Sequence, residues 1–102
     1  MPTTTTTQDI IATLRAHEPE LRQAGILSLR LFGSYARGQA TEASDIDLLA
    51  DLDPAAHMTL FELCALDRKL SELLGRPVEI LPTPVESERL RAAIARDLKH
   101  VF

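Results

Sequence analysis

LFGSYARG (residues 31–38) and SDIDLL (residues 44–49) are the two stretches of sequence that decide the expected fold. The first continues the run 26–32, in which leucines alternate with polar residues, a pattern typical of a half-buried strand. Gly33-Ser34 ends that strand, and the residues as far as Gly38 can form one helical turn that glycine closes. The first stretch therefore predicts a strand, a tight turn and a short helical segment.

The second stretch opens a run of alternating acidic and apolar residues from Asp45 to Leu52. This alternation predicts a second strand with Asp45, Asp47 and Asp51 on one face and apolar side chains on the other. Because a strand rises ~3.3 Å per residue, the first two carboxylates are expected roughly 6–7 Å apart. The sequence thus predicts a pair of acidic groups beside the Gly33-Ser34 turn.

Capping patterns predict helices outside these two strands. Thr6, three residues before Asp9, opens an amphipathic helix that Pro19 interrupts. A second capping box at Thr59 opens a longer helix over residues 60–74. The residues of this helix that we expect in the core are Leu60, Leu63, Leu66, Leu70, Leu73 and Leu74.

The last quarter of the chain predicts one more strand and one more helix. Residues 78–81 form a short apolar run, and Thr83-Pro84-Val85-Glu86 is typical of a helix start. The apolar stripe expected on this last helix is Leu90, Ala93, Ile94, Leu98 and Val101. We therefore expect an α/β fold in which a small mixed sheet of three strands, or slightly more, packs against helices.

Length and composition favour a single soluble domain over residues 1–102, with 1–7 as a flexible polar tail. Apolar residues make up 45% and charged residues 25%, which is ordinary for a folded domain. A formal net charge of -4 argues against a broad basic face, so direct nucleic-acid binding is not expected. We expect no membrane span, and a single Cys64, expected to be buried, fits the reducing cytoplasm.

Gly33-Ser34 could cradle phosphate oxygens. Backbone N–H groups at the start of a helical turn bind anions, glycine allows close approach, and the Ser34 hydroxyl adds a donor. Arg37 could bind a triphosphate through its planar guanidinium, or it could bond local carbonyl groups instead. Considered alone, Gly-Ser most often marks an ordinary loop.

Asp45 and Asp47 could hold Mg²⁺, which proteins bind through one or two carboxylates together with waters and phosphate oxygens. Glu79 on the third expected strand could supply a third carboxylate. Three such groups permit two ions about 3.5–4 Å apart, which stabilise the attacking and leaving oxygens of a displacement at phosphorus. A solvated strand face is the alternative, but Asp51 adds a third like charge whose repulsion a cation would relieve.

The Gly33-Ser34 and Asp45-Ile46-Asp47 pair, with ten residues between Ser34 and Asp45, resembles the motif of the nucleotidyltransferase superfamily that includes DNA polymerase beta. The two longer stretches quoted at the start resemble the minimal nucleotidyltransferase (MNT) family, and the similarity extends over nearly the whole chain. The resemblance implies a nucleotidyltransferase-like fold and ATP bound through Gly33 and Ser34. It also implies Mg²⁺, as two ions, held by Asp45, Asp47 and Glu79.

Many MNT domains are similar to antitoxins paired with HEPN-domain ribonuclease toxins, and this chain resembles such an antitoxin. The resemblance implies transfer of AMP from ATP to a tyrosine hydroxyl of the toxin. A chain of 102 residues without an acceptor-binding lobe fits an acceptor that is itself a protein. Glu79, where the family more often has aspartate, and Gln39, where an acidic residue is common, depart from the family pattern.

Two other functions stay open from the sequence. One is a non-catalytic antitoxin that inhibits the toxin by stoichiometric binding. The other is the catalytic subunit of a small-molecule nucleotidyltransferase, whose acceptor would be bound by a separate helical subunit.

Overall fold

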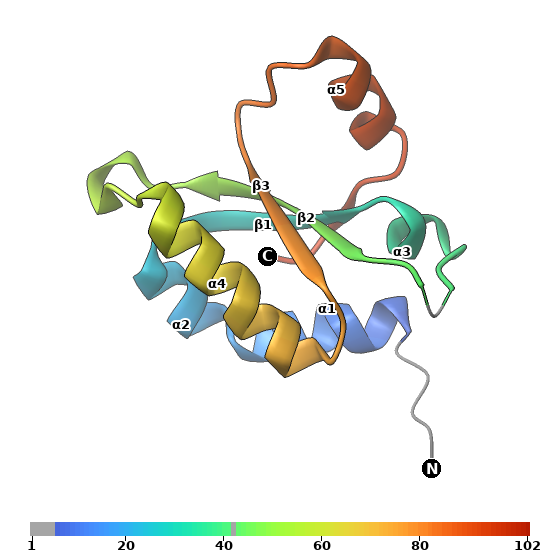
Figure 1. Ribbon diagram of the computed structural model, residues 1–102, viewed down its shortest axis with the longest axis horizontal. Helices are drawn as coiled ribbons and strands as arrows, with labels where there is room; N and C mark the ends of the chain where they lie inside the picture. Colours follow the sequence, from blue (N-terminus) through green and yellow to red (C-terminus); the bar gives the residue numbers. More distant parts are fainter. Residues whose placement is uncertain (1–5, 42) are drawn as a thin grey trace.

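The computed structural model describes residues 6–41 and 43–102 (Figure 1). Helices and strands alternate along the chain much as the hydrophobic periodicity predicts. The elements are α1 Thr7–Ala16, α2 Glu18–Ala24, β1 Ile26–Phe32, α3 Ser34–Arg37, β2 Ile46–Leu52, a 3-10 turn Pro54–Ala56, α4 Leu60–Leu74, β3 Val78–Pro82, α5 Glu88–Ala95 and β4 Lys99–His100.

The four strands form one mixed sheet in the order β3-β2-β1-β4. β1 pairs antiparallel with both β2 and β4, whereas β2 and β3 run parallel, joined by the crossover through α4. The predicted mixed sheet is confirmed, with β4 as a fourth strand. β4 was not predicted, because two residues are too few to show a hydrophobic period.

Helices α1, α2 and α4 cover one face of the sheet, and α5 lies over the other face (Figure 1). The main core lies on the first face, where apolar side chains of the three helices meet those of the strands. A smaller cluster on the second face joins Phe32 of β1, Leu49 of β2 and Ile94 of α5. The main core contains, among others, Ile10, Leu14, Leu29, Leu31, Leu48, Leu63, Leu70 and Ile80.

The predicted helix starts are confirmed at α1 and α4. Thr6 and Asp9 form a reciprocal capping box, and the Thr59 hydroxyl accepts the backbone N–H of Glu62. The expected polar tail ends earlier than residue 7, because Thr6 caps α1 and Thr7 is its first residue. The remainder of that tail, residues 1–5, lies outside the described residues.

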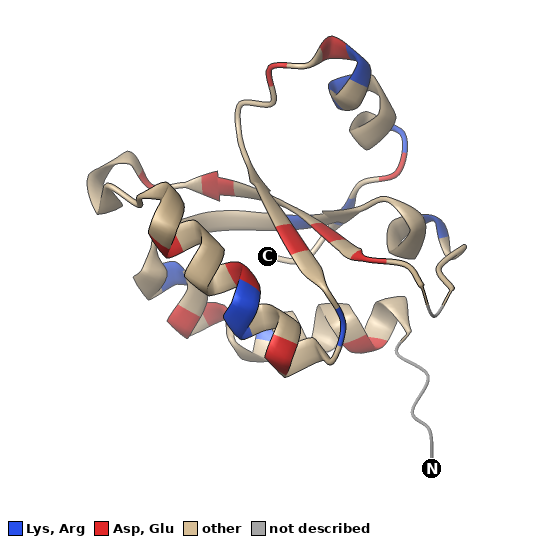
Figure 2. Cartoon of the chain, viewed as in Figure 1, with Lys and Arg blue, Asp and Glu red and all other residues tan. Residues whose placement is uncertain are grey.

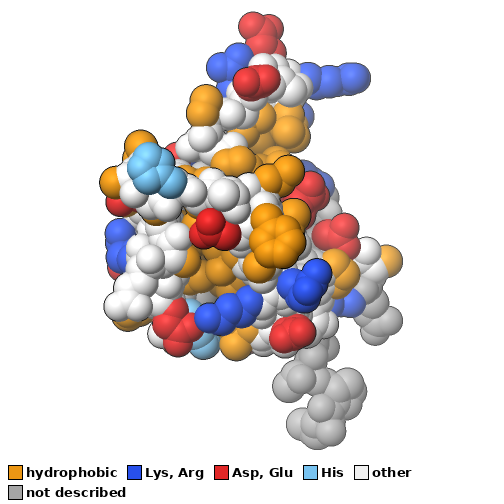
Figure 3. All heavy atoms as spheres, turned by 60° about the vertical axis from the view of Figure 1, so that its left-hand side comes forward, with side chains coloured by type: hydrophobic (Ala, Val, Ile, Leu, Met, Phe, Trp, Pro, Cys, Tyr) orange, Lys and Arg blue, Asp and Glu red, His pale blue; other side chains and the backbone are white. Residues whose placement is uncertain are grey.

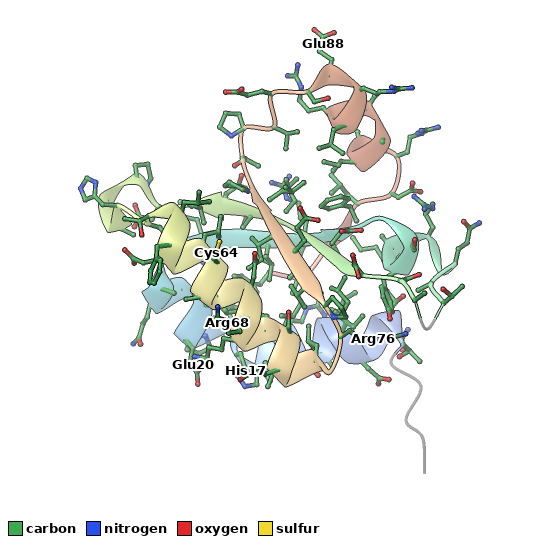
Figure 4. All side chains as sticks on the ribbon, viewed as in Figure 1. His17, Glu20, Cys64, Arg68, Arg76 and Glu88 are labelled. Carbon is green, nitrogen blue, oxygen red and sulfur yellow. The ribbon has the colours of Figure 1, made fainter. Side chains whose placement is uncertain are left out.

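Three expected core positions are exposed instead. Leu60 and Leu73 of α4 face solvent at 76% and 39% exposure, and Cys64 is also exposed (Figure 4). The buried face of α4 follows Leu63, Leu66, Leu70 and Leu74, a narrower stripe than the leucine content of the helix suggests. Leu27 of β1 is exposed as well, because the pairing with β2 shifts register between Ile26 and Ser28.

The last helix is shorter than predicted at both ends. Ser87, rather than Thr83, caps α5 by accepting the backbone N–H of Leu90, and the helix ends at Ala95. Of the predicted stripe only Ile94 is buried within the helix. Val101 is buried for another reason: its N–H donates to the Leu29 carbonyl at 2.9 Å beside the sheet.

The outer edge of β3 is tied to α4 through side chains. The Ile80 N–H donates to Asp67 Oδ1 at 3.0 Å, and the Val78 N–H donates to Ser71 Oγ at 2.9 Å. Asp67 and Ser71 lie one helical turn apart, so they reach alternate N–H groups of the edge strand. In the part of the chain that the structure describes, no helix has the length and apolar character to cross a membrane.

Candidate active site

Gly33 and Asp47 are in close contact at the end of β1. Gly33 has φ 77° and ψ -154°, a backbone conformation that side chains with a Cβ rarely adopt. A Cβ atom added there would lie 2.4 Å from Asp47 Oδ2. Position 33 therefore requires glycine for two reasons. Its backbone conformation disfavours a Cβ atom, and the Asp47 carboxylate occupies the place where that atom would lie.

Gly33 is also the residue that precedes α3, which confirms the predicted helical turn. The first helical hydrogen bond of α3 runs from the Arg37 N–H to the Gly33 carbonyl, so the preceding N–H groups are not used within the helix. Tyr35 and Ala36 are buried and anchor this turn to the core, and Gly38 closes it in the left-handed conformation. The Tyr35 hydroxyl accepts a hydrogen bond from Arg76 Nε at 3.1 Å.

Asp47 lies in the middle of the sheet, opposite Phe32 of β1 and level with Glu79 of β3. Because paired residues of neighbouring strands project to the same face, Asp47 and Glu79 both lie on the face that α5 covers. Asp45 is exposed and immediately precedes β2 rather than forming its first residue. Figure 2 shows acidic residues, in red, on the neighbouring strands β2 and β3, which agrees with the pairing of Asp47 with Glu79.

The electrostatics of Asp47 reflect this gathering of negative charge. Its pKa is raised above the ordinary value first by partial burial and then by the charges of Glu79 and Asp45, whereas Arg37 opposes the shift. Neighbouring like charges disfavour one another's ionised forms. A divalent cation at this place would reverse that effect.

The carboxylates around Asp47 are the kind of ligand that Mg²⁺ prefers, but they are not held together as closely as the sequence predicts. Within residues 6–41 and 43–102, no three His, Cys, Asp or Glu side chains lie close enough to form a ready-made metal cluster. Asp45 and Glu79 are both exposed, so neither side chain is held toward Asp47 by packing. Carboxylates completed by waters and phosphate oxygens are nevertheless the usual Mg²⁺ environment, and Asp47, which has one carboxylate oxygen beside Gly33, fits such a set.

Arg37 faces a second acidic residue that the sequence did not indicate. Its Nη1 lies 3.6 Å from Asp97 Oδ2, and both side chains are partly exposed. Asp97 follows α5, sixty residues further along the chain, so no local motif could reveal this ion pair. Arg37 thus lies close enough to Asp47 to act on its pKa, while its charge is shared with Asp97.

Asp51 does not belong to the acidic site, although it shares the strand face with Asp47. Its carboxylate accepts hydrogen bonds from the hydroxyls of Ser28 and Thr83 and from Arg30 Nη2, the last at 3.0 Å. These donors lower the Asp51 pKa below its ordinary value, chiefly through the two hydroxyl groups. The charge that Asp51 adds to the strand therefore does not call for a cation, because this carboxylate has its own partners.

Comparison with known proteins agrees with this geometry. Residues 14–100 match the family described as the nucleotidyltransferase domain. The protein adenylyltransferase MntA of Thermococcus cleftensis is 32% identical over 97 residues, which cover 94% of this chain and 96% of that protein.

Two solved structures extend the comparison to the fold. A structure described as a minimal nucleotidyltransferase superposes with a TM-score of 0.77 at 31% identity, covering 96% of this chain and 98% of the other. A variant of the MntA–HpeT toxin–antitoxin superposes with a TM-score of 0.64 at 26% identity, covering 93% and 70%. The fold is thus nucleotidyltransferase-like, and the chain belongs to the nucleotidyltransferase domain family.

Proposed function

We propose that this protein is a Mg²⁺-dependent antitoxin that transfers AMP from ATP to a tyrosine hydroxyl of a HEPN-domain toxin in the cytoplasm. The observation that carries the proposal is the contact between Gly33 and Asp47, because it joins a phosphate-binding turn to a gathering of carboxylates. A relative named as a protein adenylyltransferase matches this chain over nearly the whole length of both. We therefore expect the site at Gly33 and Asp47 to carry out nucleotidyl transfer.

Each residue of the site has a separate role in this proposal. Gly33 and Ser34 offer backbone N–H groups and a hydroxyl to the phosphate oxygens, and Arg37 adds a positive charge. Asp45, Asp47 and Glu79 would hold Mg²⁺, which when bound neutralises charge on the reacting oxygens and keeps them in line. Positioning and charge stabilisation supply most of the catalysis in such a reaction.

The chemical step balances with the residues present. The acceptor hydroxyl oxygen forms a bond to the α-phosphorus of ATP, the bond from that phosphorus to the bridging oxygen breaks, and pyrophosphate leaves. The hydroxyl proton passes to a base, for which Glu79 is our candidate because its exposed carboxylate lies level with Asp47. The products are AMP-tyrosine on the toxin and pyrophosphate.

Labelling with ATP that carries ³²P at the α-phosphate tests the proposal. The wild-type protein, Mg²⁺ and the toxin encoded beside it should yield labelled toxin, and Asp47→Asn should abolish the labelling. The control is Asp53→Asn, the same change just beyond the end of β2, where asparagine can still cap the following turn. This control should label the toxin at the wild-type rate.

Two results would replace the proposal by one of its alternatives. If the toxin is never labelled and Asp47→Asn still neutralises it in equal stoichiometry, the protein acts by binding alone. If label passes to a small metabolite or an antibiotic with no protein present, the acceptor class is wrong.

A further inference from the structure

A cavity of about 340 Å³ lies between α5 and the sheet, on the same face as the acidic residues. Its walls are mainly apolar, formed by Leu49 of β2, by Val85 ahead of α5, by Ile94 in the last turn of α5 and by Leu98 beyond that helix. Two arginines, Arg30 and Arg91, also line it. Figure 3 shows hydrophobic side chains, in orange, just below the charged residues at the top of the molecule.

The position of this cavity relative to the acidic site follows from the register of the sheet. Leu49 is two residues beyond Asp47 on β2 and projects to the same face, about 6–7 Å further along the strand. Gly33 lies at the other side of Asp47, in contact with its carboxylate. The order along this face is therefore phosphate-binding turn, acidic residues, cavity.

The stereochemistry of displacement at phosphorus indicates which part of this face the acceptor occupies. In an in-line reaction the attacking and leaving oxygens occupy opposite ends of one axis through the α-phosphorus. The nucleoside is attached to the α-phosphorus through a third oxygen and extends away from that axis. If pyrophosphate is bound at Gly33 and Ser34, the acceptor must approach from the far side of the acidic residues, which is the side on which the cavity lies.

The lining of the cavity selects among acceptor side chains. Serine and threonine carry their hydroxyl on a short stem and would leave apolar walls unfilled, whereas tyrosine carries its hydroxyl at the tip of a ring. A guanidinium can lie against the face of such a ring. Arg30 suits this role because it lines the cavity and its guanidinium is held in place by the bond from Nη2 to Asp51.

We propose that this cavity binds the aromatic ring of the acceptor tyrosine and thereby makes the enzyme specific for a phenolic hydroxyl. The inference rests on the proposed function and goes beyond it by assigning the acceptor subsite to Arg30, Leu49, Val85, Ile94 and Leu98. The ring lies against the apolar walls, and its hydroxyl points back toward Asp47 and the α-phosphorus.

Methyl NMR of the full chain tests the occupant without any need for activity. Titration with p-cresol, which has the tyrosine side chain's ring and hydroxyl, should shift the methyl signals of Leu49, Val85 and Ile94. Adenosine at the same concentration should leave those signals in place. The inference is overturned if p-cresol shifts none of them, or if adenosine shifts them instead, since the nucleoside would then occupy the cavity.

A filling substitution tests the same cavity during the reaction. Ala95 is exposed on α5 and lines the cavity, so Ala95→Phe should block it without removing any packed side chain. Ala93→Phe, two residues earlier on the same helix and outside the lining, is the matched control. Ala95→Phe should raise the KM for the toxin at least about tenfold, a typical effect of one pocket contact, and leave the affinity for a non-hydrolysable ATP analogue unchanged.

The outcomes separate this inference from the proposed function. If the wild-type protein labels no toxin, the proposed function fails, and the p-cresol titration still decides whether the cavity binds a phenol. If wild type labels the toxin but Ala95→Phe and Ala93→Phe behave alike, the inference about the cavity fails and the proposed function stands. A loss of ATP-analogue affinity in Ala95→Phe alone would also overturn the inference.

Discussion

Gly33 and Asp47 approach so closely that a single Cβ atom on the glycine would lie 2.4 Å from the aspartate Oδ2. Gly33 directly follows β1, whereas Asp47 lies on β2, and a helical turn and a loop separate them along the chain. Their contact means that the turn expected to bind phosphate and the carboxylate expected to bind metal cannot move independently. A change at Gly33 should therefore affect the chemistry through the position of Asp47.

Gly33→Ala should lower the free energy of unfolding by at least about 2 kcal/mol, because it combines a strained backbone with an overlap. Displacement of the carboxylate by about 1 Å should also reduce labelling of the toxin roughly a hundredfold. Urea unfolding and the labelling rate measure the two effects.

Gly38→Ala is the matched control for this change. Gly38 also has a left-handed backbone, with φ 72°, but a Cβ there would meet nothing within 4 Å. We expect a cost of about 1 kcal/mol and a labelling rate close to that of wild type. Equal rates for the two variants would show that the contact with Asp47 is not what constrains the site.

The sequence predicted most of the local structure because capping residues and hydrophobic period act over a few positions. The capping box at Thr6, the bounds of α4 and the turn after Gly33 are all of this kind. The sequence also predicted the acidic residues beside the Gly33-Ser34 turn, and Asp47 does lie beside Gly33, because β1, which Gly33 follows, pairs with β2.

Features that depend on contacts between distant segments could not be predicted in the same way. The ion pair of Arg37 with Asp97, the three donors around Asp51 and the cavity beneath α5 each join parts of the chain that share no periodicity. The exposure of Leu60 similarly depends on which of the leucines of α4 face the sheet, because the leucine content of the helix is wider than its buried stripe.

Mg²⁺ should stabilise the protein through the acidic residues around Asp47, because a ligand that binds only the folded state raises its stability. At a concentration about ten times the Kd, the gain is ~1.4 kcal/mol, or roughly 5–10 °C in Tm for a domain of this size. Asp47→Asn should show no such shift, and Asp53→Asn should keep it. A shift that survives in Asp47→Asn, or one that EDTA does not reverse, would place the ion elsewhere.

Asp51 should make stability depend on pH in the acidic range. Its folded pKa is lowered by the Ser28 and Thr83 hydroxyls, so it contributes stability above the unfolded value of about 3.9 and loses it as the pH falls through the folded value. The difference in unfolding free energy between wild type and Asp51→Asn should therefore narrow from pH 6 to pH 3. Urea unfolding across this range measures it, and a constant difference would contradict the assignment.

Asp67 tests how the edge strand is held. Its carboxylate accepts the Ile80 N–H at 3.0 Å, although burial raises its pKa and so disfavours the charged form. Asp67→Ala leaves that N–H without its partner and should cost about 1–3 kcal/mol, whereas Asp67→Asn keeps an acceptor oxygen and should cost much less. Glu72→Ala, an exposed change on the same helix, controls for loss of an acidic side chain.

Hydrogen exchange at Ile80 should accelerate in Asp67→Ala alone, because the bond protects an edge N–H that no neighbouring strand reaches. Equal exchange in all three variants would mean that α4 holds β3 through its leucines and not through this bond.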